Sequence, residues 1–264
     1  GEDGSLQMDR LPYSARIKTW ALDAQTTDSA PSMATYMTGV KTRNDVIGMD
    51  QNTVSLPFKP AADPTTKVAN AVNRCPTANN GLASRTLLEL AIDAGKATGA
   101  VTTARLTHAT PAATYAHVCH RDAEYDIARQ AVPGGEGANP AIGLGVDVLM
   151  GGISYYWTPY NPQWNPRGRP DGRNLVAELK DQGYWYATDT VSLGAVPTAP
   201  GTRMLALFDF AQSQGHMSYE LDRDPRVEPS LSQMATKAIE ILSKKPEGFF
   251  LMVEGGRIDH ALHG

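Results

Sequence analysis

The sequence of 264 residues has only two cysteines, Cys75 and Cys119, and no Cys-x-x-Cys pair. This scarcity argues against a thiolate zinc site, while one disulfide and two buried thiols are both compatible with the count. No apolar run approaches the roughly 18 residues that a membrane span requires. The chain also lacks a basic run and has a formal net charge of −4, so we expect no nucleic-acid-binding surface. An anionic substrate must therefore be held by local positive charge, from a metal ion or a specific arginine.

Short apolar segments alternate with amphipathic segments along the chain, and this alternation predicts an α/β fold. The predicted strands cover residues 99–106, 147–150, 184–187, 204–208 and 248–253. The predicted helices cover residues 32–39, 84–96, 174–180 and 230–244. Residues 154–173 are rich in Tyr, Trp, Pro and Asn without a period, which predicts a surface loop or small subdomain inserted in one domain spanning 1–264.

A candidate nucleophile lies near the start of the chain, in the segment Thr-Asp-Ser-Ala-Pro-Ser at residues 27–32. Ser29 stands where a helix is expected to begin, and Pro31 suits a first helical turn. A serine hydroxyl is a poor nucleophile at neutral pH and needs an activator, such as a helix N-terminus or a divalent metal ion. The alternative is that Asp28 or Ser29 only caps the helix.

A candidate metal-binding segment ends the sequence. Asp259 and His263 are four residues apart, so on a helix they share one face and can bind one ion. Their oxygen and nitrogen atoms suit Zn²⁺, although a catalytic zinc site needs a third protein ligand. Glu254 follows the strand predicted at 248–253, and ligands gather beyond the carboxyl ends of such strands. The alternative for Asp259 and His263 is a solvent-facing helix pair.

A third polar segment, residues 108–121, contains three histidines and an arginine after the strand predicted at 99–106. Thr110 stands where a ligand-binding hydroxyl is expected, and the planar guanidinium of Arg121 can hold two phosphate oxygens. The alternative for Arg121 is a surface ion pair. We expect His117 and His120 to be structural or exposed.

These three segments occur in a familiar order, and the chain resembles the alkaline phosphatases. The similar stretches are TTDSAPSMATYMTGVKT, ARLTHATPAATYAHVCHR and GFFLMVEGGRIDHALHG. The resemblance implies a three-layer sandwich, in which helices flank a central and largely parallel sheet. It also implies metal-dependent hydrolysis of phosphate monoesters through a covalent phosphoserine.

Roles for individual residues also follow from the resemblance. Ser29 would attack phosphorus, Arg121 would bind the phosphoryl oxygens with Asp28 positioning it, and His260 would contribute to phosphate binding from further out. The family uses two Zn²⁺ ions and one Mg²⁺ ion. Ser29 would be a ligand of one zinc ion, and Asp259 and His263 would be ligands of the other. Thr110 and Glu254 would bind magnesium, with His108 beside that site.

The resemblance also implies ligands that this chain does not contain, from an N-terminal strand and from a segment beyond residue 264. We therefore expect an incomplete form of the catalytic domain, with weak metal binding and little turnover by itself. The alternatives are a non-catalytic remnant and a related sulfatase or phosphodiesterase.

Partners and location are implied by the resemblance alone. The implied ligands are small phosphate monoesters and inorganic phosphate, and the implied oligomeric state is a homodimer. The implied location is periplasmic or extracellular, and the intact parent could be anchored to a membrane. Some relatives have a calcium site, and Phe208, Asp209 and Glu228 fall at roughly corresponding places. Because acidic residues are few there, we expect ordinary solvated surface groups instead.

Overall fold

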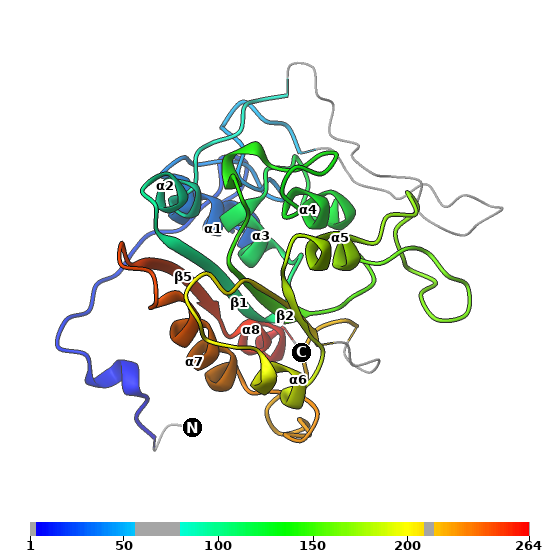
Figure 1. The fold of residues 1–264 in the computed structure, drawn as a ribbon. Coiled ribbons are helices and arrows are strands. Elements are labelled where there is room, and N and C mark those ends of the chain that lie inside the picture. Colours follow the sequence, from blue (N-terminus) through cyan, green and yellow to red (C-terminus); the bar gives the residue numbers. More distant parts are fainter. Residues whose placement is uncertain (1–3, 56–79, 209–213, 264) are drawn as a thin grey trace.

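Five parallel strands form one sheet, in the order β3-β4-β2-β1-β5, in the computed structural model of this chain (Figure 1). The structure describes residues 4–55, 80–208 and 214–263. The strands are β1 (Ala97–Arg105), β2 (Val148–Gly152), β3 (Trp185–Ala187), β4 (Met204–Phe208) and β5 (Phe249–Glu254). Each predicted strand is present, and its ends differ from the prediction by two residues at most.

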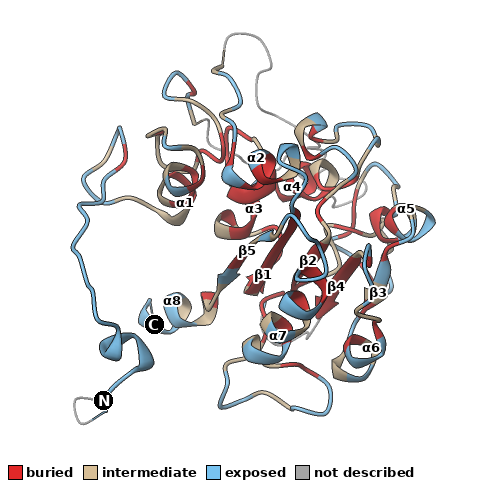
Figure 2. Cartoon of the chain, turned by 60° about the vertical axis from the view of Figure 1, so that its left-hand side comes forward, coloured by how far each residue is buried: buried red, intermediate tan, exposed pale blue. Residues whose placement is uncertain are grey.

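Helices cover both faces of this sheet (Figures 1 and 2). The first five lie on one face, while α6 and α7 lie on the other, as the two separate apolar clusters show. The helices are α1 (Ser29–Thr38), α2 (Leu87–Asp93), α3 (Ala109–Tyr115), α4 (Glu124–Gln130), α5 (Leu175–Asp181), α6 (Thr190–Ala195), α7 (Leu231–Leu242) and α8 (Gly256–Leu262). Two short 3₁₀ turns span Gln7–Arg10 and Pro140–Ile142. The α/β prediction and the implied three-layer arrangement are therefore confirmed.

The interior strand β4 shows why such strands were predictable from apolar runs. Met204, Ala206 and Phe208 pack in the cluster that contains α7, whereas Leu205 and Leu207 pack in the cluster on the opposite face. Successive side chains of a strand point to opposite faces. A strand covered on both faces therefore needs apolar residues at every position, which gives a continuous run in the sequence.

Helix ends were predicted less well than strands. The helix expected at 32–39 begins at Ser29, because Asp28 caps it by accepting a hydrogen bond from the Ala30 N–H, and it ends at Gly39 with φ of 72°. The helix expected at 84–96 is shorter and begins after Thr86, which forms a capping box with Glu89. The prediction missed α3, α4 and α6, which have six or seven residues each.

A buried carboxylate, Glu89, ties α2 to the rest of this helical layer. It accepts hydrogen bonds from His117 Nε2 at 2.6 Å, Asn139 Nδ2 at 2.6 Å and the Thr86 N–H at 2.9 Å. Burial alone would raise the pKa of Glu89, but the hydrogen bond and charge of His117 and the Asn139 bond outweigh it and lower the pKa. His117 is therefore structural, as expected.

Replacing Glu89 by glutamine is expected to lower the free energy of unfolding by about 3 kcal/mol at pH 7, because His117 loses its buried partner. Since the folded-state pKa of Glu89 is lowered, its ionised carboxylate stabilises the protein above the unfolded pKa of about 4.3, and this stabilisation is lost as the pH falls through the folded value. The free energies of unfolding of wild type and Glu89→Gln, measured with urea, should therefore become equal as the pH is lowered. Asp93→Asn, at a half-exposed pair with Arg85, should cost less than about 1 kcal/mol. A difference for Glu89→Gln that is independent of pH would contradict this account.

The segment 154–173 has no helix or strand, only isolated bridges such as Pro159 with Arg169. It is nevertheless anchored in the interior, because Trp157 and Arg169 are fully buried. Arg169 Nη1 donates to the carbonyls of Tyr125 at 2.7 Å and Tyr156 at 3.0 Å. These bonds fix the segment against α4.

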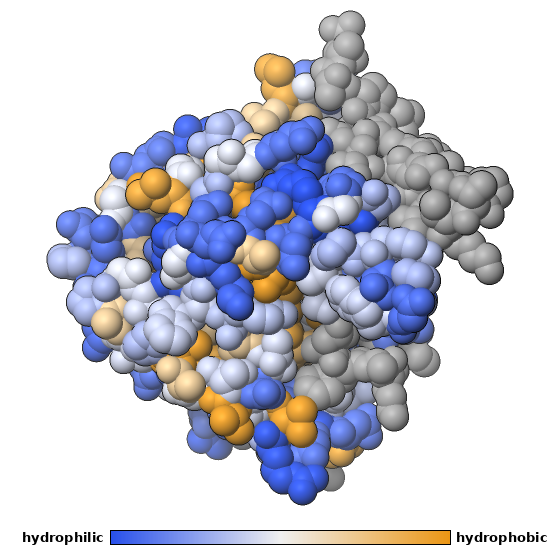
Figure 3. All heavy atoms as spheres, turned by 45° about the vertical axis from the view of Figure 1, so that its right-hand side comes forward, coloured by the Kyte–Doolittle hydropathy of each residue, from blue (hydrophilic) through white to orange (hydrophobic). Residues whose placement is uncertain are grey.

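The surface of the molecule is mostly polar on the face shown in Figure 3, where apolar groups lie in separate patches. Among the helices in the described part of the chain, none combines the length and apolar character needed to span a bilayer. Cys119 is disulfide-bonded, which agrees with one of the two alternatives for the cysteines. Cys75, the other cysteine of the sequence, lies outside the described residues.

Candidate active site

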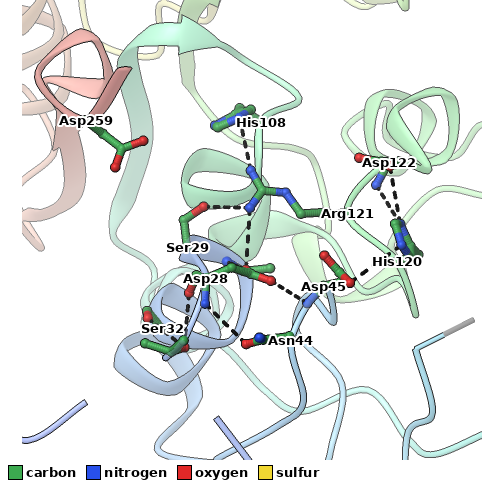
Figure 4. Close-up of polar contacts among 12 residues, drawn as sticks. Asp28, Ser29, Ser32, Asn44, Asp45, His108, His120, Arg121, Asp122 and Asp259 are labelled. Atoms are coloured by element: carbon green, nitrogen blue, oxygen red, sulfur yellow. Dashed lines mark hydrogen bonds and ion pairs between the residues drawn. The ribbon is translucent and has the colours of Figure 1, made fainter. Parts of the chain in front are cut away.

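Ser29 is the first residue of α1, at the edge of a polar cavity (Figure 4). Its Oγ accepts a hydrogen bond from Arg121 Nη1 at 2.9 Å. The cap of the helix is Asp28 and not Ser29, since the Asp28 carboxylate accepts from the Ala30 N–H. Helix capping therefore accounts for one role of Asp28, whereas it does not account for the contact between the Ser29 hydroxyl and Arg121.

Asp28 is held from two sides. Its Oδ2 accepts the Asp45 N–H at 2.7 Å, and its own N–H donates to Asn44 Oδ1 at 3.2 Å. Its Oδ1 lies 3.4 Å from Arg121 Nη1. Asp45 has φ of 68°, a conformation that aspartate tolerates better than most residues. This turn thus fixes the carboxylate that faces Arg121.

Arg121 contacts side chains from two segments that are far apart in the sequence. Besides Asp28 and Ser29, its Nη2 lies 3.0 Å from His108 Nε2, as Figure 4 shows. Its side chain is only 19% exposed, so the alternative of a solvated surface arginine does not describe it. Because guanidinium only donates hydrogen bonds, His108 Nε2 must be the acceptor.

The cavity in front of Ser29 has a volume of about 480 Å³ and brings together two of the predicted segments with the end of the chain. In Figure 4, Asp259 points toward the space beside Ser29 and Arg121. The lining residues are Thr26, Thr27, Asp28, Ser29, Asn44, His108, Arg121, Asp259, His260 and His263. Folding therefore gathers the Ser29 hydroxyl, the Arg121 guanidinium and a group of carboxylate and imidazole side chains around one space.

Asp259 and His263 lie one turn apart on α8, as the spacing predicted. Asp259 Oδ1 is 3.5 Å from His263 Nε2, and the two side chains are 65% and 77% exposed. This exposure fits the solvent-facing alternative. Their place in the lining of the Ser29 cavity fits the metal-ligand alternative.

Glu254 lies at the carboxyl end of β5, opposite Thr102 of β1 in the parallel register. Its Oε2 accepts from Thr102 Oγ1 at 2.5 Å, and Thr110 also donates to it. Burial raises the pKa of Glu254, and the two hydroxyl bonds oppose that rise. The sequence prediction included Thr110 and Glu254 but missed Thr102, which is adjacent to Glu254 only through strand pairing.

Three histidines meet beside this carboxylate. His108, His216 and His260 each offer one ligand atom, and these atoms lie within 4.8 Å of one another, so the group could hold a metal ion. Burial, and then the nearby arginines, lower the pKa of His108 to about 2 and of His216 to about 3, and also lower that of His260. The sequence prediction missed His216, although it follows the strand predicted at 204–208.

His120, Phe208 and Glu228 are not among the residues that line the cavity. His120 is buried, 3.7 Å from Asp45 and 3.8 Å from Asp122 in ion-pair contacts. Phe208 is buried at the end of β4, and Asp209 lies outside the described residues. The expectation of a solvated Glu228 was wrong, because this side chain is buried and its Oε1 accepts the Ser218 N–H at 2.7 Å. The hydrogen bond to the Ser218 N–H helps to offset the cost of burying the Glu228 carboxylate.

Known proteins with similar sequences are alkaline phosphatases. The enzyme of Gadus morhua is 36% identical over 284 residues, covering 100% of this chain and 54% of the relative. The tissue-nonspecific isozyme of Homo sapiens is 35% identical over 285 residues, covering 100% of this chain and 50% of the relative. The chain thus spans about half the length of these relatives.

Solved structures show the same likeness. The Thermus thermophilus alkaline phosphatase superimposes with a TM-score of 0.69 at 30% identity, over 94% of this chain and 42% of that one. A variant of the TAB5 alkaline phosphatase, described with Mg bound in its M3 site, superimposes with a TM-score of 0.64 at 26% identity, over 94% of this chain and 56% of that one. The sequence profile of the family described as "Alkaline phosphatase" matches residues 1–264. Together with the fold and the cavity at Ser29, these matches show that the chain belongs to the alkaline phosphatase family.

Proposed function

We propose that the complete protein, over the length its relatives span, hydrolyses phosphate monoesters through a phosphoserine formed on Ser29. The observation that carries this proposal is the contact of Ser29 Oγ with Arg121 Nη1 at 2.9 Å in a cavity lined by Asp259 and His263. The contact places a nucleophile and an anion-binding cation within reach of one phosphoryl group. It supports phosphoryl transfer better than it supports a simple helix cap.

The chain's own residues then have defined tasks. Ser29 Oγ forms a bond to phosphorus while the ester P–O bond breaks, and the alcohol leaves with a proton. A water molecule then cleaves the phosphoserine and releases inorganic phosphate. Arg121 holds phosphoryl oxygens with its planar fork, and Asp28 keeps that fork in place. The partial positive charge at the start of α1 favours the negative charge that gathers beside Ser29.

The donor atoms in this region fit the metals that the family resemblance implies. Asp259 and His263 offer the oxygen and nitrogen ligands that suit Zn²⁺, and Ser29 would be a ligand of a second zinc ion. Thr110 and Glu254 offer oxygen ligands, which suit Mg²⁺. Bound metal would supply Lewis acidity and lower the pKa of an attacking hydroxyl or water.

The proposal is tested with protein stripped of metal by a chelator and then given Zn²⁺ and Mg²⁺. We expect hydrolysis of p-nitrophenyl phosphate to return with the metals. The matched esters p-nitrophenyl sulfate and bis(p-nitrophenyl) phosphate should be poorer substrates. Faster hydrolysis of the sulfate would favour a sulfatase, faster hydrolysis of the diester would favour a phosphodiesterase, and no hydrolysis of any ester would favour a non-catalytic remnant.

We propose that the protein is exported, to the periplasm or the cell exterior, because disulfide bonds such as that of Cys119 form and persist in oxidising compartments. Cell fractionation tests this location, and a reduced cytoplasmic protein would contradict it. We also propose a homodimer on the basis of the family, which light scattering of the complete protein can check.

A further inference from the structure

We propose that His108, His216 and His260 form a nitrogen-ligand site for a transition-metal ion such as Zn²⁺ or Co²⁺, distinct from the oxygen ligands Thr110 and Glu254. The three imidazoles come from different strand ends. His108 follows β1 as the N-cap of α3, His216 follows β4, and His260 lies on α8 directly after β5. Neighbouring parallel strands end at the same edge of the sheet, which is where ligands gather in such folds.

The spacing of the three rings suits a small ion. One ligand atom from each ring lies within 4.8 Å of the other two. A metal ion bound tetrahedrally at about 2.1 Å from each nitrogen sets two ligand nitrogens about 3.4 Å apart, so a closure of at most about 1.4 Å between two rings would complete the site. Three imidazoles with an open position are an established ligand set for zinc.

The orientation of the three imidazole rings also allows their nitrogen lone pairs to point at one metal ion. Their planes stand at 84°, 77° and 64° to one another, with centroids 5.3, 5.6 and 4.2 Å apart. The lone pair of an imidazole nitrogen lies in the plane of its ring. Three stacked rings would therefore point their lone pairs in parallel, whereas inclined rings can direct them at one ion from different sides.

Arginines contact all three imidazoles and show that these rings can be neutral ligands. Arg121 Nη2 lies 3.0 Å from His108 Nε2, and Arg105 Nη1 lies 2.7 Å from His216 Nε2. The third contact, from Arg257 Nη1 to His260 Nδ1, is 3.1 Å. Because guanidinium only donates, His108 Nε2 and His260 Nδ1 accept through a lone pair. His216 also faces the Arg105 backbone N–H with its Nδ1 at 3.1 Å, and only one of its two nitrogens is an acceptor in the neutral ring.

The arginines carry positive charge, but each has a partner that offsets it. Arg105 makes two hydrogen bonds to Glu124, at 2.8 and 2.9 Å, and Arg121 faces Asp28. The Arg257 guanidinium lies 3.7 Å from the centroid of the Tyr219 ring. An ion that uses the lone pairs now facing Arg105 and Arg121 must displace those two guanidinium groups. Each group would keep its carboxylate partner after moving.

The ligand atoms determine the class of metal. Imidazole nitrogen favours Zn²⁺, Co²⁺, Ni²⁺ or Cu²⁺, whereas carboxylate and hydroxyl oxygens favour Mg²⁺. His216 belongs to this group alone, since it is neither a lining residue of the Ser29 cavity nor one of the ligands proposed above. It is therefore the residue whose replacement tests this site separately.

The experiment is a Co²⁺ titration of chelator-stripped protein in excess Mg²⁺, followed by the visible absorption of bound Co²⁺ and by counting bound metal with mass spectrometry. We expect His216→Gln to lose one equivalent of Co²⁺ relative to wild type, while His216→Asp, which keeps a ligand oxygen, retains it. The matched control is His120→Gln, because His120 is also a buried histidine but lies outside the group. It should bind as many equivalents as wild type.

An unchanged number of equivalents and an unchanged spectrum in folded His216→Gln would overturn the proposal. The proposal would also be overturned if the three histidines bound phosphate or chloride in place of the metal and this anion binding were lost in His216→Gln. Circular dichroism establishes folding, and if His216→Gln is unfolded, His260→Gln takes its place in the titration with the same expected loss. Since the readout is bound metal, it does not depend on whether the protein proves to be a phosphatase.

Discussion

Replacing Ser29 by alanine is expected to lower kcat for phosphate-monoester hydrolysis by at least about 10³-fold. The physical reason is that no other hydroxyl is held against the Arg121 guanidinium in the contacts of the described residues, where Ser29 Oγ lies 2.9 Å from Nη1. A water molecule could replace the nucleophile only poorly, because it lacks the fixed position that the start of α1 gives to Ser29. Steady-state rates with p-nitrophenyl phosphate measure the effect in the complete, metal-loaded protein.

The matched control for this change is Ser32→Ala on the same helix. Ser32 Oγ is hydrogen-bonded to Thr27 Oγ1 at 3.1 Å, whereas the hydrogen bonds of Arg121 within the described residues go to Asp28, Ser29 and His108. We expect Ser32→Ala to keep kcat within a few-fold of wild type. If Ser29→Ala retained full activity, or if Ser32→Ala lost as much as Ser29→Ala, the assignment of Ser29 as nucleophile would be wrong.

Arg121→Ala is expected to lower kcat/KM by about 10²- to 10³-fold, the range found when one donor to a transition-state oxyanion is removed. The inhibition constant of inorganic phosphate should rise as well. Arg121→Lys should recover only part of the loss. A lysine ammonium is a point charge and cannot hold two oxygens with the fork by which Arg121 now reaches both Ser29 and His108.

A surface arginine provides the control for Arg121. Arg226 pairs with Asp224 and its side chain is 87% exposed, so Arg226→Ala should leave kcat/KM and phosphate inhibition unchanged. An unchanged phosphate inhibition constant in Arg121→Ala, with the same fold by circular dichroism, would contradict the role of Arg121 in binding the phosphoryl group.

The sheet was predictable because the apolar runs that mark its strands are local features of the sequence. The strand β4 is buried on both faces, so the segment 204–208 has to be apolar throughout, and this is visible without a structure. The rule that ligands lie beyond strand ends then pointed to Glu254 and to Thr110. The pair Asp259 and His263 was predictable for the same reason, since a four-residue spacing on one helix is a local property.

The rest of the site depends on contacts between distant segments, and these have no local signature. Thr102 reaches Glu254 because β1 and β5 pair in a particular register. His216 joins His108 and His260 because three separate strands end at one edge. The start of α1 was misplaced by three residues, because either Asp28 or Ser29 could have been the cap on sequence grounds alone.

The central claim is that Ser29 itself takes up the phosphoryl group, and mapping the phosphorylated residue tests it most directly. Complete, metal-loaded protein would be mixed with p-nitrophenyl phosphate, quenched in acid, digested and sequenced by tandem mass spectrometry. The account predicts phosphate on the peptide that contains Ser29, and its absence when Arg121 is alanine and turnover is lost. Phosphate on a different residue, or steady hydrolysis without any phosphorylated peptide, would contradict it.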